Sequence, residues 1–292
     1  MHPGPEKMLG IIYNPMSRKG FNRHRVEDIR RILDEHNFPY EYRETECPLD
    51  GIRVAREMSE TCDTIVSVGG DGTLFEVVNG AHDKGVTFGI LPFGSGNDVS
   101  RSLHVYKKSD EELADMLMNP KVRTVDSGVY DGKVFLLFVS FGIVADIIKA
   151  YMGLKKAGRS GYARAVLKAV FHHKPKNYHI KLPDREFDCY ADFVAIQNVP
   201  TAGGGLYTNG LGVDNDGHLD LVIINHVGRI RLVRNAIALF RGKLHKQKNV
   251  DVIPVTTIDV DLGEKRIGSL DGELVEYEKV HVEMGEPIKF LH

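Results

Sequence analysis

Three short segments of the sequence combine glycine with residues that suit phosphate chemistry. They are NPMSRKG (14–20), GGDGT (69–73) and PFGSGND (92–98). Glycine lets backbone N–H groups approach phosphate oxygens closely, and a helix that begins just after such a loop adds a favourable dipole. Glycine also occurs at strand–turn–helix junctions for steric reasons alone, so one such loop would be weak support. Three of them together favour a polyphosphate-binding site.

The segments around these loops predict the elements that would position them. Apolar stretches at 8–13, 63–68 and 86–91 predict strands, PYEYRE at 39–44 also predicts one, and helical patterns lie between them. Strands that alternate with helices indicate a parallel, doubly wound sheet, in which ligands bind where loops leave the carboxyl ends of the strands. The G-x-G-x-x-G and GxxxxGK[ST] motifs are absent, so neither an ordinary dinucleotide-binding dehydrogenase nor a P-loop protein is indicated.

The pattern changes near residue 124. Asp131-Gly132 lies between two apolar runs and predicts a β-hairpin, and later segments alternate like antiparallel strands. Helical insertions are expected at about 145–172 and 229–243. The second half of the chain is therefore expected to be β-rich.

The length of 292 residues fits two domains better than one. We predict an α/β domain over residues 1–124 and a β-rich domain over residues 125–281. The closing segment, about 282–292, is short and strand-like, and from its pattern it could return to either domain.

The bulk composition excludes several classes of protein. The net charge of −2 gives no support for a polyanion-binding protein, and three distant cysteines without a CxxC pair suggest neither a disulfide framework nor a zinc site. The N-terminal MHPGPEKML lacks the apolar core of a signal peptide, and no apolar run reaches 18 residues. We expect a soluble, cytoplasmic protein whose contact with membranes is peripheral.

Further motifs extend the pattern of the glycine loops along the chain. The order NP-x-S, GGDGT and G-S-G-N-D, followed by Asp126 in TVDSG, by VDNDGHLDLVII and by SLDGELVE, resembles the diacylglycerol kinase catalytic family. That family includes bacterial soluble lipid kinases, sphingosine kinases and ceramide kinases. The resemblance covers nearly the whole chain. Ser95 stands where bacterial members usually carry threonine, and the hydroxyl is kept.

The resemblance implies a fold and an activity. The implied fold is an N-terminal α/β nucleotide-binding domain, similar to NAD kinase and phosphofructokinase, followed by a C-terminal β-sandwich, with the active site between them and the tail returning to the first domain. The implied activity is ATP-dependent phosphorylation of a lipid hydroxyl, above all diacylglycerol to phosphatidic acid, as in phospholipid biosynthesis. Mg²⁺ is the implied cofactor, and a homodimer is also implied.

The same resemblance assigns residues to the ATP site. They are Asn14, Pro15, Ser17, Arg18, Thr45, Gly69, Gly70, Asp71, Gly72, Thr73, Gly94, Ser95 and Asn97. A carboxylate does not favourably face bare phosphate oxygens, so Asp71 is expected at the catalytic Mg²⁺, with Asp98 and Asp126 in the same network. Asn97 or Asp98 could instead cap the helix that follows.

Glu273 in the DGE motif is the candidate general base. A lipid hydroxyl is a weak nucleophile, so a positioned base assists its attack on the γ-phosphate. From the residues alone, Asp271-Gly272 is typical of a hairpin turn and Glu273 of a solvated strand residue. The resemblance favours the base.

The loop Val213–His218 is a separate candidate site. The resemblance implies a structural Mg²⁺ here, held by the side chain of Asp216 and the backbone carbonyls of Val213 and His218. Asp214 is a further carboxylate nearby. The loop is too short for an EF-hand, and a plain Asp-Gly hairpin is the alternative.

Two stretches, 147–183 and 221–250, contain many lysines and arginines and no acidic residue. Basic helical faces beside apolar ones suit an anionic membrane surface, although solvated helix faces explain such stretches equally well. Nucleic acid is not expected as a partner, because aromatic residues are not interleaved and no recognition motif is present.

Three functions therefore compete. A lipid kinase is favoured, because NAD kinases share GGDGT but not the GSGND and terminal DGE segments. A non-catalytic nucleotide or lipid sensor would not need the four acids Asp71, Asp98, Asp126 and Glu273 together. The acceptor stays open among diacylglycerol, monoacylglycerol, sphingoid base, ceramide, phosphatidylglycerol and an undecaprenyl-like alcohol.

Overall fold

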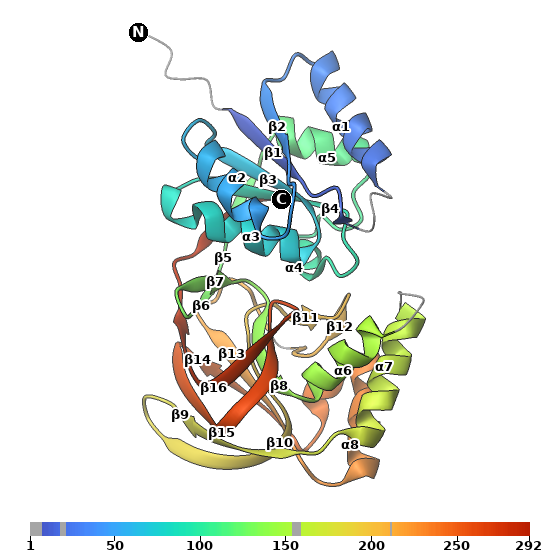
Figure 1. Ribbon diagram of the computed structural model, residues 1–292, viewed down its shortest axis with the longest axis vertical. Helices are drawn as coiled ribbons and strands as arrows, with labels where there is room; N and C mark the ends of the chain where they lie inside the picture. The colour runs from blue at the N-terminus through green and yellow to red at the C-terminus, as the bar shows by residue number, and fades with distance from the viewer. Residues whose placement is uncertain (1–7, 18–21, 154–158, 211) are drawn as a thin grey trace. The chain divides into compact units, whose positions relative to one another are not determined.

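A computed structural model describes the chain at residues 8–17, 22–153, 159–210 and 212–292. The chain forms two compact units (Figure 1). The first unit comprises the residues up to Val125 together with Pro287–His292, and the second comprises Asp126–Glu286. The chain therefore leaves the first unit once and returns to it near its C-terminal end.

A six-stranded sheet forms the centre of the first unit, in the order β2-β1-β3-β4-β17-β5. Its strands are β1 (Leu9–Tyr13), β2 (Tyr40–Glu44), β3 (Thr64–Gly69), β4 (Thr87–Pro92), β5 (Val122–Val125) and β17 (Ile288–Leu291). The first four strands pair in parallel, whereas β17 is parallel to β4 and antiparallel to β5. The C-terminal strand thus joins the sheet of the first unit.

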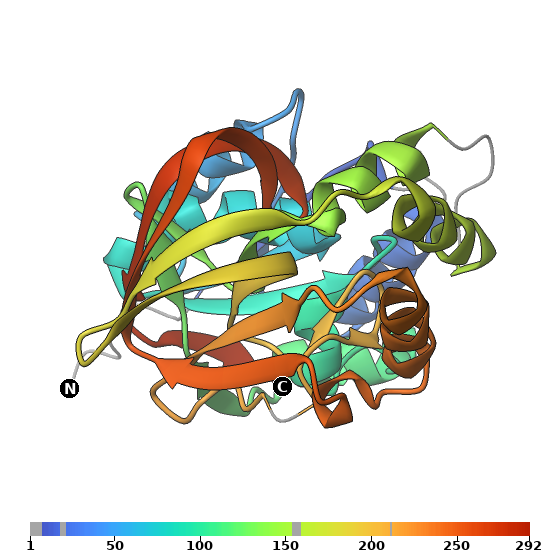
Figure 2. The same ribbon diagram turned by 90° about the horizontal axis from the view of Figure 1, so that it is seen from below.

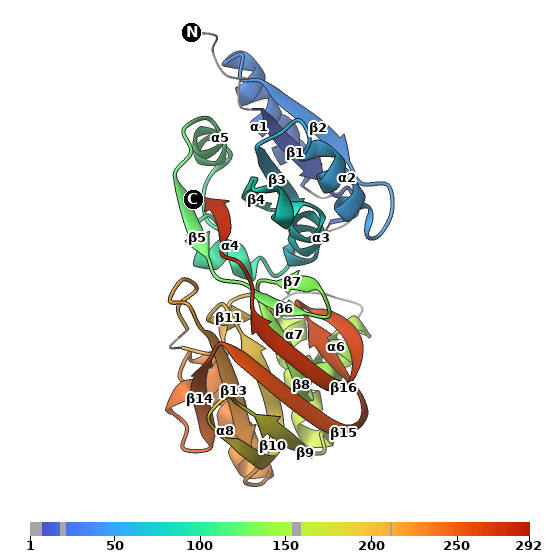
Figure 3. The ribbon, with the colours of Figure 1, turned by 90° about the vertical axis from the view of Figure 1, so that its left-hand side faces the viewer.

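Helices cover both faces of this sheet. They are α1 (Arg23–Glu35), α2 (Asp50–Met58), α3 (Asp71–Ala81), α4 (Asp98–Ser102) and α5 (Asp110–Met118), with a 3-10 turn at His82–Lys84. Helices α2 and α3 pack together on one face, and α1 and α5 pack together on the other (Figure 3). Strands β1, β3 and β4 are apolar and almost wholly buried, as expected for a parallel sheet covered on both sides. The predicted doubly wound fold is confirmed.

The second unit is built on antiparallel strands. They are β6 (Gly128–Tyr130), β7 (Lys133–Phe135), β8 (Phe138–Gly142), β9 (Lys176–Lys181), β10 (Glu186–Gln197), β11 (Thr201–Ala202), β12 (Leu206–Tyr207), β13 (Leu219–Asn225), β14 (Val250–Val255), β15 (Thr257–Leu270) and β16 (Glu273–Met284). The long strands β10 and β15 both pair with β8 at one end and with β9 at the other. This sandwich-like sheet confirms the β-rich prediction, and the Asp131-Gly132 turn between β6 and β7 confirms the predicted hairpin.

Three helices gather at one side of the second unit (Figure 2). They are α6 (Ile143–Met152), α7 (Arg159–His172) and α8 (Arg229–Phe240), and a 3-10 turn follows at Leu244–Lys246. Their apolar faces share one core with β10 and β13, which includes Ile147, Val166 and Phe193. Within the described residues, no helix is both long and apolar enough to cross a membrane.

Candidate active site

The GGDGT and PFGSGND loops touch through their backbones in the first unit. A Cβ atom placed on Gly94 would lie 2.2 Å from the Cα of Gly70, and one placed on Gly70 would lie 3.1 Å from the Cα of Gly94. No larger residue fits at position 94 unless the loops separate. The two glycines therefore allow the loops after β3 and β4 to form one continuous backbone surface.

The loop after β1 joins the same cluster. The Nδ2 atom of Asn14 donates a hydrogen bond to Oγ1 of Thr73 over 3.1 Å, and the Ser17 hydroxyl donates to the carbonyl of Phe93 over 3.3 Å. Asn22, which the sequence did not single out, also donates to the Phe93 carbonyl, over 2.8 Å. All three loops are thus brought together, while Arg18 lies outside the described residues.

Other predicted ATP-site residues lie in or beside this cluster. Thr45 follows β2, is buried, and its N–H donates to the carbonyl of Tyr13 over 2.9 Å. Gly69 packs against Thr73, since a Cβ there would lie 2.5 Å from the threonine Oγ1. Gly72 lies in the first turn of α3, whose outermost N–H groups have no partner inside the helix. Ser95 is exposed, and Pro15 lies in the turn that follows β1.

The side chain of Asn97 stabilises the PFGSGND loop by hydrogen bonds to the loop's own backbone. It is buried in a left-handed conformation with φ 57°; its Nδ2 donates to the carbonyls of Pro92 and Gly94, and its Oδ1 accepts from the N–H of Gly94. Its side chain makes no capping hydrogen bond to α4. Asn97 occupies the N-cap position of α4, but the alternative that its side chain caps this helix is wrong, because its amide is used within the loop.

The carboxylate of Asp71 binds the start of α4 instead. It accepts the N–H of Asp98 over 3.1 Å and that of Val99 over 3.3 Å, so an acid at the start of α3 stabilises the helix that begins 27 residues later. A Cβ on Gly96 would lie 2.8 Å from Oδ2 of Asp71 and 3.5 Å from Oδ2 of Asp98. Both carboxylates border the same space, and such oxygen donors suit Mg²⁺.

Asp126 lies in the second unit and contacts the predicted metal loop. Its Oδ2 accepts the N–H of Gly217 over 2.8 Å, and its own N–H donates to the carbonyl of Asp214 over 2.7 Å. In addition, Asn198 donates to the Asp126 carbonyl over 2.6 Å. The structure thus brings Asp126 together with the Val213–His218 loop.

The Val213–His218 loop turns at Asp216-Gly217. The Oδ1 of Asp216 accepts the N–H of His218 over 3.2 Å, and both side chains are about half exposed. Asp220, which the sequence analysis missed, lies nearby: burial, followed by the charge of Asp216, raises the pKa of Asp220 to about 6. In the part of the chain that the structure describes, no three His, Cys, Asp or Glu residues are grouped as a metal site.

The DGE motif lies at the tip of the β15–β16 hairpin. Asp271 and Gly272 form its two-residue turn with φ angles of 47° and 98°, as in a type I′ turn. The buried carboxylate of Asp271 accepts the N–H groups of Leu136, Leu137 and Phe138, each over 2.9 Å. Burial raises the pKa of Asp271 to about 6, against these three donors, which lower it.

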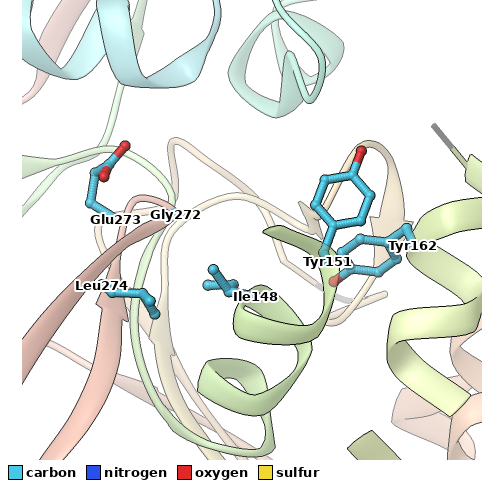
Figure 4. A pocket seen from close by; sticks show the side chains of 6 residues that line it. All are labelled: Ile148, Tyr151, Tyr162, Gly272, Glu273 and Leu274. Atoms are coloured by element: carbon cyan, nitrogen blue, oxygen red, sulfur yellow. The ribbon is translucent and has the colours of Figure 1, made fainter. Parts of the chain in front are cut away.

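Asp271 therefore fixes the hairpin tip to the start of β8. The hairpin turn that the residues alone indicate at Asp271-Gly272 is present, whereas the anchoring role of Asp271 was not predicted. The next residue, Glu273, is exposed. It borders a cavity of about 410 Å³ that Ile148, Tyr151, Tyr162, Gly272 and Leu274 also line (Figure 4). A carboxylate at an otherwise mostly apolar cavity can accept a proton from an alcohol bound there.

Comparison with known proteins agrees with this architecture. Residues 8–130 match the diacylglycerol kinase catalytic domain, and residues 138–285 match the YegS C-terminal NAD kinase beta sandwich-like domain. The chain is 26% identical over 273 residues to a diacylglycerol kinase of Bacillus subtilis, covering 91% of this chain and 90% of the relative. It is 24% identical over 294 residues to a diacylglycerol kinase of Staphylococcus saprophyticus, covering 96% of each.

A solved structure shows the same fold. The crystal structure of a diacylglycerol kinase from Bacillus anthracis superposes with a TM-score of 0.76 at 21% identity, over 98% of this chain and 97% of the other. The two family matches together span most of the chain, in the order expected. The chain therefore belongs to the family that joins a diacylglycerol kinase catalytic domain to a YegS-type C-terminal domain, and it is a lipid kinase.

Proposed function

We propose that this lipid kinase transfers the γ-phosphate of Mg-ATP to the hydroxyl of diacylglycerol and so makes phosphatidic acid, a precursor in phospholipid biosynthesis. The observation that carries the proposal is the convergence of three loops at the start of α3. Asp71 and the Gly70–Gly94 contact join the loops after β3 and β4. The hydrogen bonds of Asn14 and Ser17 join the loop after β1 to them. The relatives named diacylglycerol kinase support the choice of acceptor.

In this proposal the first unit binds the nucleotide. The first-turn N–H groups of α3, at Gly72 and Thr73, face the phosphates, where the helix dipole favours negative charge. Asp71 and Asp98, whose carboxylates border the same space beside Gly96, hold the catalytic metal. Mg²⁺, when bound, neutralises charge on the transferring phosphoryl group. The Val213–His218 loop is proposed to hold a second, structural Mg²⁺ through Asp216.

Glu273 supplies the base in the second unit. Its carboxylate takes the proton of the acceptor hydroxyl as the hydroxyl oxygen bonds to the γ-phosphorus. The bond between that phosphorus and the β–γ bridging oxygen breaks, and ADP leaves with the electron pair. Asp271 serves as a positioning residue, because its three backbone hydrogen bonds determine where the next residues of the turn lie.

We also propose that α7 and α8 meet an anionic membrane surface, where the acceptor resides. The two helices pack against each other and expose large apolar side chains, Leu167 and Phe171 on α7 and Ile230 on α8, within stretches that carry no acidic residue. Such basic and apolar faces bind anionic headgroups and insert shallowly. Sedimentation with phosphatidylglycerol vesicles should be lost in Phe171→Ser, while phosphatidylcholine vesicles alone should not sediment the native protein.

The test of the reaction is transfer of labelled γ-phosphate to lipids in mixed micelles. The acceptors are diacylglycerol, monoacylglycerol, sphingosine and ceramide, with NAD as a soluble control. Label in phosphatidic acid, dependent on magnesium and lost in Asp71→Asn, supports the proposal. Label in another lipid would replace diacylglycerol as acceptor, and label in NAD alone would contradict the lipid reaction. The homodimer implied by the resemblance stays a prediction that light scattering tests.

A further inference from the structure

A buried aspartate of the second unit lies at a β-bulge. Strand β10 pairs with β13 through Ala191 and Phe193, and Asp192 between them is the extra residue. A bulge of this kind changes the direction of a side chain and is common beside functional sites. A Cβ on Gly142, the residue before α6, would lie 2.4 Å from the carbonyl oxygen of Asp192, so the start of α6 touches the bulge. The side chain of Asp192 is 2% exposed, and a carboxylate buried in this way needs compensating donors or positive charge.

Two histidines from different elements face this carboxylate. Nδ1 of His226, which follows β13, lies 2.9 Å from Oδ1 and 3.1 Å from Oδ2 of Asp192. His173, which follows α7, is buried, and its Nε2 lies 3.9 Å from Oδ1 of Asp192. Within the described residues this Nε2 makes no hydrogen bond. On the other side of the ring, Nδ1 of His173 lies 2.8 Å from Oδ2 of Asp146 on α6. The His173 ring therefore stands between carboxylates of α6 and β10.

The other polar groups of this region keep their charge near neutral pH or face solvent. Tyr178 of β9 is buried, and burial raises the pKa of its hydroxyl to about 12, so it stays neutral. The guanidinium of Arg266, which is always charged, lies over the Tyr178 ring at 5.3 Å from the ring centroid. His172 and Lys174, which flank His173 in the sequence, are exposed. A change of pH near neutrality therefore acts on Asp192 through the two histidines that face it.

The charge of the His173 ring determines how many carboxylates it can bind. A neutral imidazole carries one N–H and a protonated imidazole carries two. With Asp146 as acceptor at Nδ1, the neutral ring turns the lone pair of Nε2 toward Asp192, which is unfavourable. The protonated ring donates from both nitrogens, and a shift of about 1 Å brings Nε2 within hydrogen-bond distance of Asp192. His226 needs only one N–H for its contact, so its neutral form suffices.

We propose that protonated His173 bridges Asp146 of α6 and Asp192 of β10, and that this bridge positions α6 in the second unit. Histidine changes its charge between about pH 5 and 8. The bridge exists while the ring is charged, so it is present on the acid side of this range and is lost as pH rises through it.

The bridge has a consequence for the cavity beside Glu273. Ile148 and Tyr151 line that cavity, and both belong to α6, the helix that Asp146 connects to His173 (Figure 4). His173 is thus a positioning residue that acts through α6. This consequence rests on the proposed function, in which Glu273 deprotonates the acceptor hydroxyl, whereas the bridge itself does not.

Hydrogen–deuterium exchange of the α6 amides tests the bridge without any substrate. After correction for the intrinsic exchange rate at each pH, the protection of α6 in the native protein should fall by about tenfold between pH 6 and pH 8.5, the scale of one hydrogen bond to a charged group. In His173→Gln the protection should be low at both pH values. His281→Gln is the matched control, because it removes an exposed histidine that pairs with Asp259 over 2.8 Å, and it should behave as the native protein does.

Acceptor kinetics test whether the bridge positions α6 for the reaction. The kcat/KM for diacylglycerol of the native protein, divided by that of His173→Gln, should be about tenfold higher at pH 6 than at pH 8.5, because a displacement of 1 Å near a reacting site costs up to about 10²-fold. The KM for ATP should be the same in both proteins. Dividing the two values removes the titration of Glu273, which both proteins share.

Several outcomes would overturn the inference. Equal protection of α6 in the native protein and His173→Gln at both pH values overturns the bridge. A difference in protection that follows pH, combined with a kinetic ratio that does not, overturns the positioning role. If His173→Gln does not fold, Asp146→Asn, which neutralises a half-exposed carboxylate of the bridge, replaces it in both measurements. Failure of the proposed function looks different, since the native protein would then phosphorylate no lipid while the exchange measurement still decides the bridge.

Discussion

Two turns of the molecule use aspartate in the same way and then diverge. In the first unit, Asp71 of GGDGT accepts two backbone N–H groups of α4; in the second, Asp271 of DGE accepts three N–H groups at the start of β8. Asp71 also borders the space beside Gly96, whereas Asp271 is buried. One carboxylate thus combines anchoring with a place at the proposed ligand site, while the DGE motif divides these tasks between Asp271 and exposed Glu273.

The largest expected effect is on kcat, and it should distinguish Glu273, which is proposed to act only in the reaction, from Asp71, which also stabilises the fold. Glu273→Gln should lower kcat by about 10²- to 10⁴-fold, the contribution of a general base, with stability changed by less than about 0.5 kcal/mol. Asp71→Asn should lower both kcat and the melting temperature, because its carboxylate has both tasks. Steady-state kinetics measure kcat, and thermal unfolding measures the melting temperature. Glu278→Gln, which removes the charge of another glutamate on β16, is the matched control for Glu273→Gln. Equal loss of stability in Glu273→Gln and Asp71→Asn would contradict the division.

Asp271 should show the opposite behaviour to Glu273. Asp271→Ala leaves three buried N–H groups without an acceptor, so we expect the free energy of unfolding to fall by about 3 kcal/mol or more. Asp271→Asn keeps one acceptor oxygen and should lose less. Denaturant titration measures both. A stable Asp271→Ala variant that lacks activity would instead assign Asp271 a direct role in the reaction.

Gly94→Ala tests the close backbone contact between Gly70 and Gly94, which has no counterpart at the DGE turn. The added Cβ would meet Gly70 Cα at 2.2 Å, and overpacking of this kind costs about 1–3 kcal/mol. The KM for ATP should rise, because the two loops separate. Gly153→Ala is the control, since a Cβ there meets nothing closer than 3.7 Å. An unchanged KM for ATP would show that the nucleotide does not depend on this contact.

Asp271 should also make the stability of the protein depend on pH. Its pKa of about 6 in the folded state is above the value of about 3.9 in an unfolded chain, so the native state binds more protons between these values. Stability should therefore fall as pH rises from about 4 to 6. Asp271→Asn removes this titration, and its unfolding free energy should fall less over the same range. Parallel curves would place the pKa of Asp271 near its ordinary value.

The sequence predicts the parts of the structure that depend on local pattern. Alternating strands and helices reveal the doubly wound sheet, and Asp131-Gly132 reveals a hairpin, because φ > 0 at both turn positions favours these residues. Glycine spacing also locates the three loops. The roles of Asn97 and Asp71 were not predictable in this way. An asparagine just before a helix has the usual sequence of an N-cap residue, and the sequence does not show that the distant Asp71 binds the first N–H groups of α4 in its place.

The position of Tyr151 and Tyr162 at the cavity beside Glu273 was not predicted, for a related reason. Tyr151 and Tyr162 fall in a region that the sequence presents as one helical stretch, and they face Glu273 only because α6 and α7 fold back on a shared core. Likewise, the hydrogen bonds of Asp271 reach residues more than a hundred positions earlier in the chain. Pairing over such separations is determined by tertiary structure, which single-sequence patterns do not encode.

The position of β17 has a consequence for the order in which the protein can fold. This strand lies between β4 and β5, and the whole of Asp126–Glu286 separates it from β5 along the chain. During synthesis, β4 and β5 each lack their β17 partner until the entire second unit has been made. The unit that begins first on the ribosome is therefore completed last, and a nascent chain exposes the edges of β4 and β5 for the longest part of its synthesis.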